Sequence, residues 1–141
     1  MVLSDFAFEL GKIRWMYDNT TLDRFMFLQD SVVVKDQALF NLLDEPGSIA
    51  LTNDPRPFGM YMGVYERNVL AQIEIPLPQS KQESIEREIS WTEEYCRHTT
   101  VLRTAYPELT DRNATREEQL FGRNNLVLEN EHLIKYKGTW H

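Results

Sequence analysis

The chain has 141 residues, and its 22 acidic side chains outnumber 15 Lys and Arg to give a formal net charge of −7. This length fits one domain over residues 1–141, and 42% apolar residues can fill a hydrophobic core, which excludes a disordered tail. The acidic balance argues against sequence-independent binding to duplex DNA, and no run of roughly 20 apolar residues is present to span a membrane.

The first residues and the cysteine content bear on the compartment. The N-terminal stretch has no basic leader and reaches Asp5 at once, so we expect no secretory signal and a cytoplasmic protein. The single cysteine, Cys96, excludes an intramolecular disulfide framework and a cysteine-rich zinc site.

The first third of the chain is predicted to hold a short strand and two helices. Residues 13–17 form the candidate strand, although helical and strand spacings compete there. Residues 19–21 are typical of a helix cap, and apolar residues at helical spacing predict a helix over 22–29. A second helix is predicted from about 33 to 45, where Pro46-Gly47 stops it.

Three strands are predicted next, over 48–53, 58–65 and 69–77. Apolar and polar side chains alternate along the second and third of these segments, which is the spacing of a half-buried strand. Pro76 and Pro78 end the third strand, because proline cannot donate to a ladder.

The second half of the chain opens with the longest predicted helix, which runs from Ser80 to about residue 99. Ser80 and Glu83 form a capping box, in which each side chain satisfies one free backbone N–H. A strand over 101–106, a short helix over 114–121 and a hairpin over 126–140 complete the order.

These elements predict an α/β (α+β) fold. A mixed, mostly antiparallel central sheet of five to seven strands carries helices on both faces. The strands at 58–65, 69–77 and 101–106 should be central. The predicted core contains Phe25, Leu39, Leu42, Met60, Met62, Ile73, Ile75, Ile85, Ile89, Leu102 and Leu120.

Candidate chemistry is sparse in this sequence. The histidines are too scattered for the three or four converging ligands of a metal site, and Cys96 lies on the apolar stripe of its helix, where a buried, inert thiol is expected. The helix that opens at Ser80 follows a predicted strand and presents free N–H groups to an anion, with Lys81 adding charge. Glu74, in that strand, is either a general base or a residue of an exposed sheet face.

The order of elements resembles the GCN5-related N-acetyltransferase superfamily. Residues 79–84, QSKQES, have the first Gln and the spacing of that family's pyrophosphate loop, with Gln82 and Ser84 at its small positions. The segment NATREEQLFGRNNLVLE, from Asn113, is similar to the family's Asn and following helix. The resemblance implies an acyl-CoA N-acyltransferase-like fold and an acetyl-coenzyme A site formed by Ile73, Ile75, Gln79, Ser80, Lys81, Gln82, Ser84 and Asn113.

Two classes of function remain open. In an active transferase, Glu74 would take a proton from a small-molecule or protein amine, and Tyr106 would return one to the leaving thiolate. The alternative is a non-catalytic binding or structural protein, such as an interaction subunit or a small viral component, that presents an acidic surface to a protein partner or to a second copy of itself. The side chains of Gln82 and Ser84 favour the alternative, because they would crowd the pyrophosphate.

Overall fold

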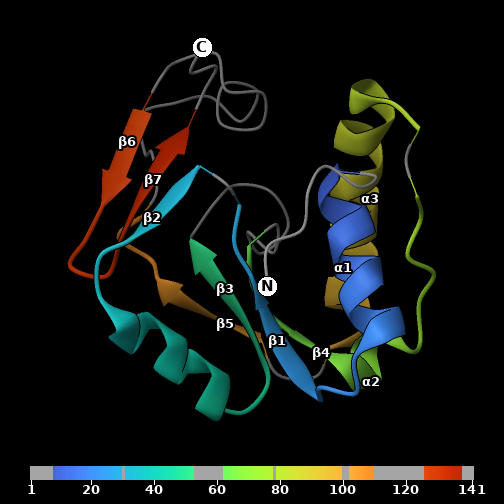
Figure 1. Ribbon diagram of the computed structural model, residues 1–141, viewed down its shortest axis with the longest axis horizontal. Coiled ribbons are helices and arrows are strands. Elements are labelled where there is room, and N and C mark those ends of the chain that lie inside the picture. The colour runs from blue at the N-terminus through green and yellow to red at the C-terminus, as the bar shows by residue number, and fades with distance from the viewer. Residues whose placement is uncertain are drawn as a thin grey trace.

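The computed structural model of the protein describes residues 8–29, 31–52, 62–77, 79–99, 102–109 and 126–137. Within these residues the chain is a mixed α/β structure with mostly antiparallel pairing (Figure 1). A four-stranded sheet lies in the middle, two helices cover one of its faces, and a three-stranded sheet with a short 3-10 helix lies on the other side.

The four-stranded sheet has the order β1-β4-β3-β5. Its strands are β1 (Arg24–Phe27), β4 (Gly63–Glu66), β3 (Ser48–Thr52) and β5 (Leu102–Tyr106). The pairs β1/β4 and β4/β3 are antiparallel, whereas β3 and β5 are parallel. All five residues of β3 are buried, as expected for a central strand with both faces covered.

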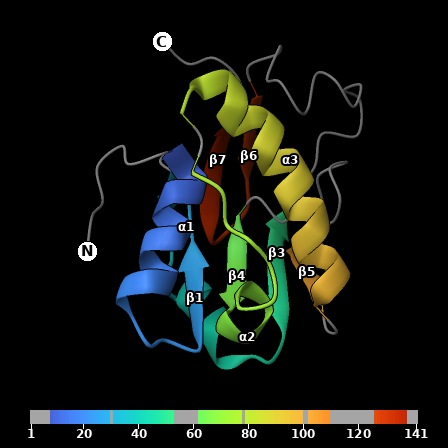
Figure 2. The same cartoon turned by 90° about the vertical axis from the view of Figure 1, so that its right-hand side faces the viewer.

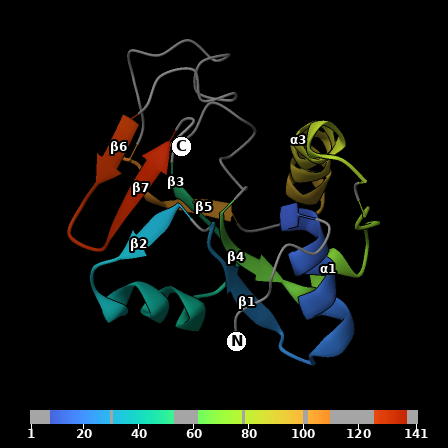
Figure 3. The same ribbon diagram turned by 45° about the horizontal axis from the view of Figure 1, so that its top comes forward.

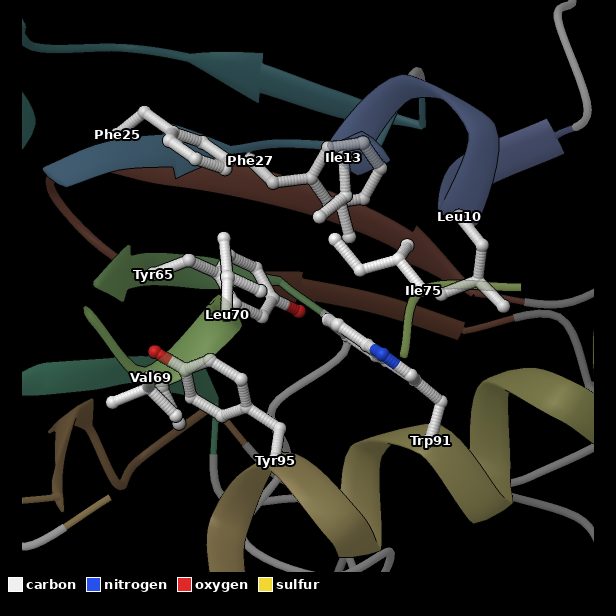
Figure 4. Packing of buried hydrophobic residues seen from close by; sticks show 11 residues of the cluster. Leu10, Ile13, Phe25, Phe27, Tyr65, Val69, Leu70, Ile75, Trp91 and Tyr95 are labelled. Carbon is white, nitrogen blue, oxygen red and sulfur yellow. The ribbon is translucent and has the colours of Figure 1, made fainter. Parts of the chain in front are cut away.

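Two helices, α1 (Phe8–Asn19) and α3 (Lys81–His98), lie side by side on one face of this sheet (Figure 2), and the single turn α2 (Arg67–Leu70) follows β4. The core between helices and sheet is rich in aromatic rings (Figure 4). Tyr65 lies at its centre, with ring centroids 5.0 Å from Tyr95, 5.7 Å from Trp91 and 6.1 Å from Phe25. These edge and offset contacts fix the position of α3 on the sheet.

The second sheet has the order β2-β7-β6 and is antiparallel (Figure 3). Its strands are β2 (Val32–Val34), β7 (Leu133–Lys137) and β6 (Leu126–Glu129). A 3-10 helix, η1 (Gln37–Asp44), begins at Asp36, whose side chain accepts a hydrogen bond from the Ala38 N–H. The core between the two sheets contains Leu39, Leu42, Ile49, Leu51, Met62, Val64, Tyr106, Leu109 and Leu133.

Residues 71–77 connect α2 to α3 without forming a strand. This segment runs along the side of the helix pair that faces away from the sheets (Figures 1 and 2). It is anchored by Ile75, which is 6% exposed and enters the core beside Leu10, Ile13 and Trp91 (Figure 4).

Several predicted elements are confirmed. The strand at 48–53 is β3, the strand at 101–106 is β5, and the predicted hairpin is the pair β6 and β7. The long helix is α3, with Ser80 as its cap, since the hydroxyl oxygen accepts from the Glu83 N–H at 3.1 Å. Of the predicted core, Phe25, Leu39, Leu42, Met62 and Ile75 are buried.

The predictions for the first third of the chain are mostly wrong. Residues 13–17 belong to α1, because Leu10 and Ile13 share the buried face of a helix. The predicted helix at 22–29 contains β1 instead, in which Phe25 and Phe27 point into the core while Leu22 is 51% exposed. The predicted helix at 33–45 divides into the end of β2 and η1.

The predicted strand at 69–77 is also wrong. Val69 and Leu70 are both buried in the helical turn α2. In a strand, two successive side chains would point to opposite faces of the sheet. Strand β5 pairs with β3 and not with residues 69–77. The described strands form two sheets, where one sheet is expected. Ile73 and Leu102 are only partly buried.

Some predictions fall outside the described residues. These are the helix at 114–121, the first part of the strand at 58–65, and the core positions Met60 and Leu120. Ile85 and Ile89 lie in α3, but their side chains are outside the described part as well.

Candidate functional site

Two pockets border residues 71–77. The α1-side pocket, of about 240 Å³, lies against α1, and the α3-side pocket, of about 250 Å³, lies against α3. Glu74 lines both pockets, and Ile73 and Ile75 line the first. The structure therefore brings three of the residues predicted to form a site to one surface, which makes this region the candidate site.

The α1-side pocket is open to solvent and is bordered by contacts between α1 and the connecting segment. The Arg14 guanidinium donates to the Ile75 carbonyl oxygen at 3.4 Å and pairs with Asp18 at 3.5 Å. Tyr17 also lines the pocket. Arg14 is therefore engaged by two partners. Of the charged groups that line this pocket, the Glu74 carboxylate is the one without an ion pair among the described residues.

The α3-side pocket carries charges of both signs. Its basic side chains are already paired along the helix, Arg87 with Glu83 at 3.4 Å and Arg97 with Glu94 at 3.7 Å. Glu74 and Glu93 line the same pocket and have no ion pair or hydrogen bond within the described ranges. Exposed pairs of this kind are weak, so all of these charges remain able to interact with a ligand.

Trp91 lines the α3-side pocket from α3. Its side chain points toward Ile75 (Figure 4), and the residue is 5% exposed. The indole Nε1–H is buried and has no hydrogen-bond partner in the part of the chain that the structure describes. An unsatisfied buried donor of this kind costs about 1–3 kcal/mol, so it is an unusual feature for a residue at a pocket.

The residues predicted to hold a pyrophosphate make contacts within their own segment. Gln79 Nε2 donates to the Leu77 carbonyl at 3.3 Å, Gln82 Nε2 donates to Glu86 at 3.0 Å, and Ser80 caps α3. None of the three lines either pocket. Lys81 and Ser84 lie in α3 with side chains outside the described part, and Asn113 lies outside the described residues.

The predicted acid, Tyr106, lies elsewhere. It packs in the core between the two sheets, and its ring stacks on His132 with centroids 5.2 Å apart. Burial is the main cause that raises the pKa of Tyr106, and the Glu108 carboxylate adds to it. Tyr106 lines neither pocket that Glu74 borders, so the structure does not bring the predicted base and acid to one site.

A buried polar network was missed by sequence reasoning. The Ser48 hydroxyl donates to Glu66 Oε2 at 2.7 Å and lies 2.8 Å from the Tyr95 hydroxyl and 3.1 Å from that of Thr99. The Tyr95 oxygen also accepts from the Glu66 N–H at 2.8 Å. These hydrogen bonds join α3 to the sheet. Because Ser48 is fully buried, its hydroxyl is not an accessible nucleophile. The hydrogen-bonded pairs in this network are 18 to 51 residues apart, and no local pattern marks them.

Burial raises the pKa of the Cys96 thiol to about 12. At pH 8 we expect iodoacetamide to alkylate the folded protein on the order of 10²–10³-fold more slowly than the urea-unfolded chain, because only the thiolate reacts. The difference should shrink as the pH rises toward 12. Mass spectrometry of timed aliquots measures both rates, and equal rates in the two states would show that the thiol is not shielded.

The described residues hold no group of three or more His, Cys, Asp or Glu side chains placed to bind a metal ion. Among the helices of these residues, none is long and apolar enough to cross a membrane. Comparison of the chain with protein families, with curated proteins and with solved structures finds no match.

Proposed function

We propose that the protein is a non-catalytic binding protein whose site is formed by the two pockets on either side of residues 71–77. The separation of Glu74 from Tyr106 carries this proposal. Proton transfer requires a base and an acid within hydrogen-bond reach of one reacting centre, and these two side chains border different parts of the molecule. The same proposal includes the prediction that an acidic surface of the protein binds a protein partner or a second copy of the chain.

A coenzyme A dependent N-acetyltransferase is the second candidate. One observation favours it: Glu74 has an unpaired carboxylate at two pockets, where it could accept a proton from an amine, and the capped N-terminus of α3 follows a few residues later. The acyl-CoA N-acyltransferase-like fold would place a strand before that helix. Residues 71–77 instead form a connection without ladder hydrogen bonds, which supports the first candidate.

Acetyl-coenzyme A distinguishes the two candidates. A ligand at 100 times its dissociation constant stabilises a protein by about 2.7 kcal/mol, which thermal unfolding detects readily. We expect acetyl-coenzyme A to leave the melting temperature unchanged and to acetylate no amine in a panel followed by mass spectrometry. A rise in melting temperature together with acetylation that Glu74→Gln slows by roughly 10²–10⁴-fold would contradict the binding proposal and establish the transferase.

A further inference from the structure

The α3-side pocket combines three features that a single small ligand can satisfy. Glu74 and Glu93 supply carboxylates without partners among the described residues. Arg87 and Arg97 supply guanidinium groups that, within the described ranges, are held only by exposed pairs. Trp91 supplies an apolar ring and a buried N–H donor without an acceptor.

The arrangement of these groups follows from the helix. Residues 87, 90 or 91, 94 and 97 follow one another by steps of three or four, so the five form one stripe of α3 facing the pocket. Glu74 and Pro76 line the pocket from the connecting segment. Groups of both charges therefore surround a volume of about 250 Å³, below the range typical of sites for drug-sized ligands.

Neither a simple cation nor a simple anion uses all of these groups. A cation would engage the carboxylates but would leave the Trp91 donor without an acceptor. An anion would engage the donors but would meet the repulsion of Glu74 and Glu93. A ligand with an ammonium group and a carboxylate close together answers both requirements, and an aliphatic side chain on it would pack against the Trp91 ring and Pro76.

We propose that the α3-side pocket binds a free aliphatic α-amino acid, an inference that rests on the proposed binding function and names its ligand class. The ammonium group lies toward Glu74 and Glu93, and the carboxylate lies toward Arg97 or Arg87. One carboxylate oxygen accepts from the Trp91 N–H, a contact that requires residues 74–76 to move aside, because this N–H is buried. Each charge of the ligand is then matched, and the buried donor gains its acceptor.

NMR titration with L-leucine tests the proposal. The chain has three tryptophans, and Trp91→Phe identifies which indole ¹H–¹⁵N signal belongs to Trp91. Two matched compounds each lack one charge: 3-methylbutylamine has no carboxylate, and 4-methylpentanoate has no ammonium group. We expect L-leucine to shift the Trp91 signal saturably and each of the other two to bind at least about tenfold more weakly.

Two variants locate the site. Glu74→Gln should weaken L-leucine binding by about tenfold, because it removes one of the two carboxylates that face the ammonium group. Glu86→Gln is the matched control, since Glu86 is an exposed residue of the same helix that does not line the pocket, and binding should be unchanged. Both substitutions are at exposed positions, so both variants are expected to fold.

Three results would overturn the proposal: no shift with L-leucine, equal binding of L-leucine and 3-methylbutylamine, or equal loss in Glu74→Gln and Glu86→Gln. Each would reject the amino acid as the ligand while leaving the non-catalytic assignment intact. Acetyl transfer from acetyl-coenzyme A, by contrast, rejects the proposed function itself, so the two failures are distinguishable.

Discussion

Gly63→Ala is expected to lower the free energy of unfolding by about 3–5 kcal/mol, a loss at the upper end for single substitutions. A Cβ atom at this position would lie 1.9 Å from the Ile49 carbonyl oxygen and 3.0 Å from its carbon. Both are backbone atoms of the neighbouring strand β3, so neither can move aside as a flexible side chain would. The methyl group must therefore push β3 and β4 apart.

The position of Gly63 makes this separation costly. It pairs with Ala50 on one side and with Phe27 on the other, in the interior of the four-stranded sheet. Urea unfolding followed by circular dichroism measures the loss. Gln72→Ala, at an exposed position outside both sheets, is the control and should stay within about 0.5 kcal/mol of the parent protein. A similarly small change for Gly63→Ala would contradict the close approach of the two strands.

The parts of the fold that could be predicted are those with strong local signals. Helix α3 has a capping box at Ser80 and a long amphipathic sequence, and β3 lies between Pro46-Gly47 and a sequence rich in proline. The hairpin of β6 and β7 turns at Asn130, whose side chain accepts from the N–H groups of His132 and Leu133. In each case the residues that mark the start or the end of the element are neighbours in the sequence.

The secondary-structure predictions fail where contacts between residues far apart in the sequence decide the conformation. The residues of β1 fit a helix as well as a strand by spacing, and pairing with β4 makes them a strand. Residues 69–77 alternate like a strand, yet no strand among the described residues pairs with them, and the burial of Ile75 between the helices holds them instead. Propensity is a weak guide in such segments because tertiary contacts override it.

The candidate site was predicted only in part, for the same reason. The sequence points to Glu74 and its neighbours, and they do border two pockets. The partner groups Arg14, Arg87 and Trp91 come from helices whose packing against residues 71–77 no local pattern reveals. The expectation that Tyr106 shares this site depended on a strand that is not formed.

Arg67 is a second residue whose importance only the structure reveals. Its guanidinium group donates to carbonyl oxygens at and just beyond the C-terminal end of α1: Nη1 to Tyr17 at 3.0 Å, Nη2 to Thr20 at 2.5 Å, and Nε to Leu22 at 2.8 Å. The same group lies 4.7 Å from the centroid of the Tyr17 ring. It therefore supplies donors to carbonyls that a helix end leaves unsatisfied, together with a cation–π contact.

We expect Arg67→Ala to lower the free energy of unfolding by about 2–4 kcal/mol, because part-buried carbonyls lose a charged donor and α1 loses its link to α2. Arg67→Lys should recover less than half of this loss, since an ammonium group cannot reproduce the planar fork of donors. Arg103→Ala is the matched control: Arg103 is exposed and pairs only with Glu45 at 2.6 Å among the described residues, and such pairs contribute at most about 1 kcal/mol. Urea unfolding measures all three variants, and equal losses for Arg67→Ala and Arg103→Ala would show that Arg67 does not hold the end of α1 in place.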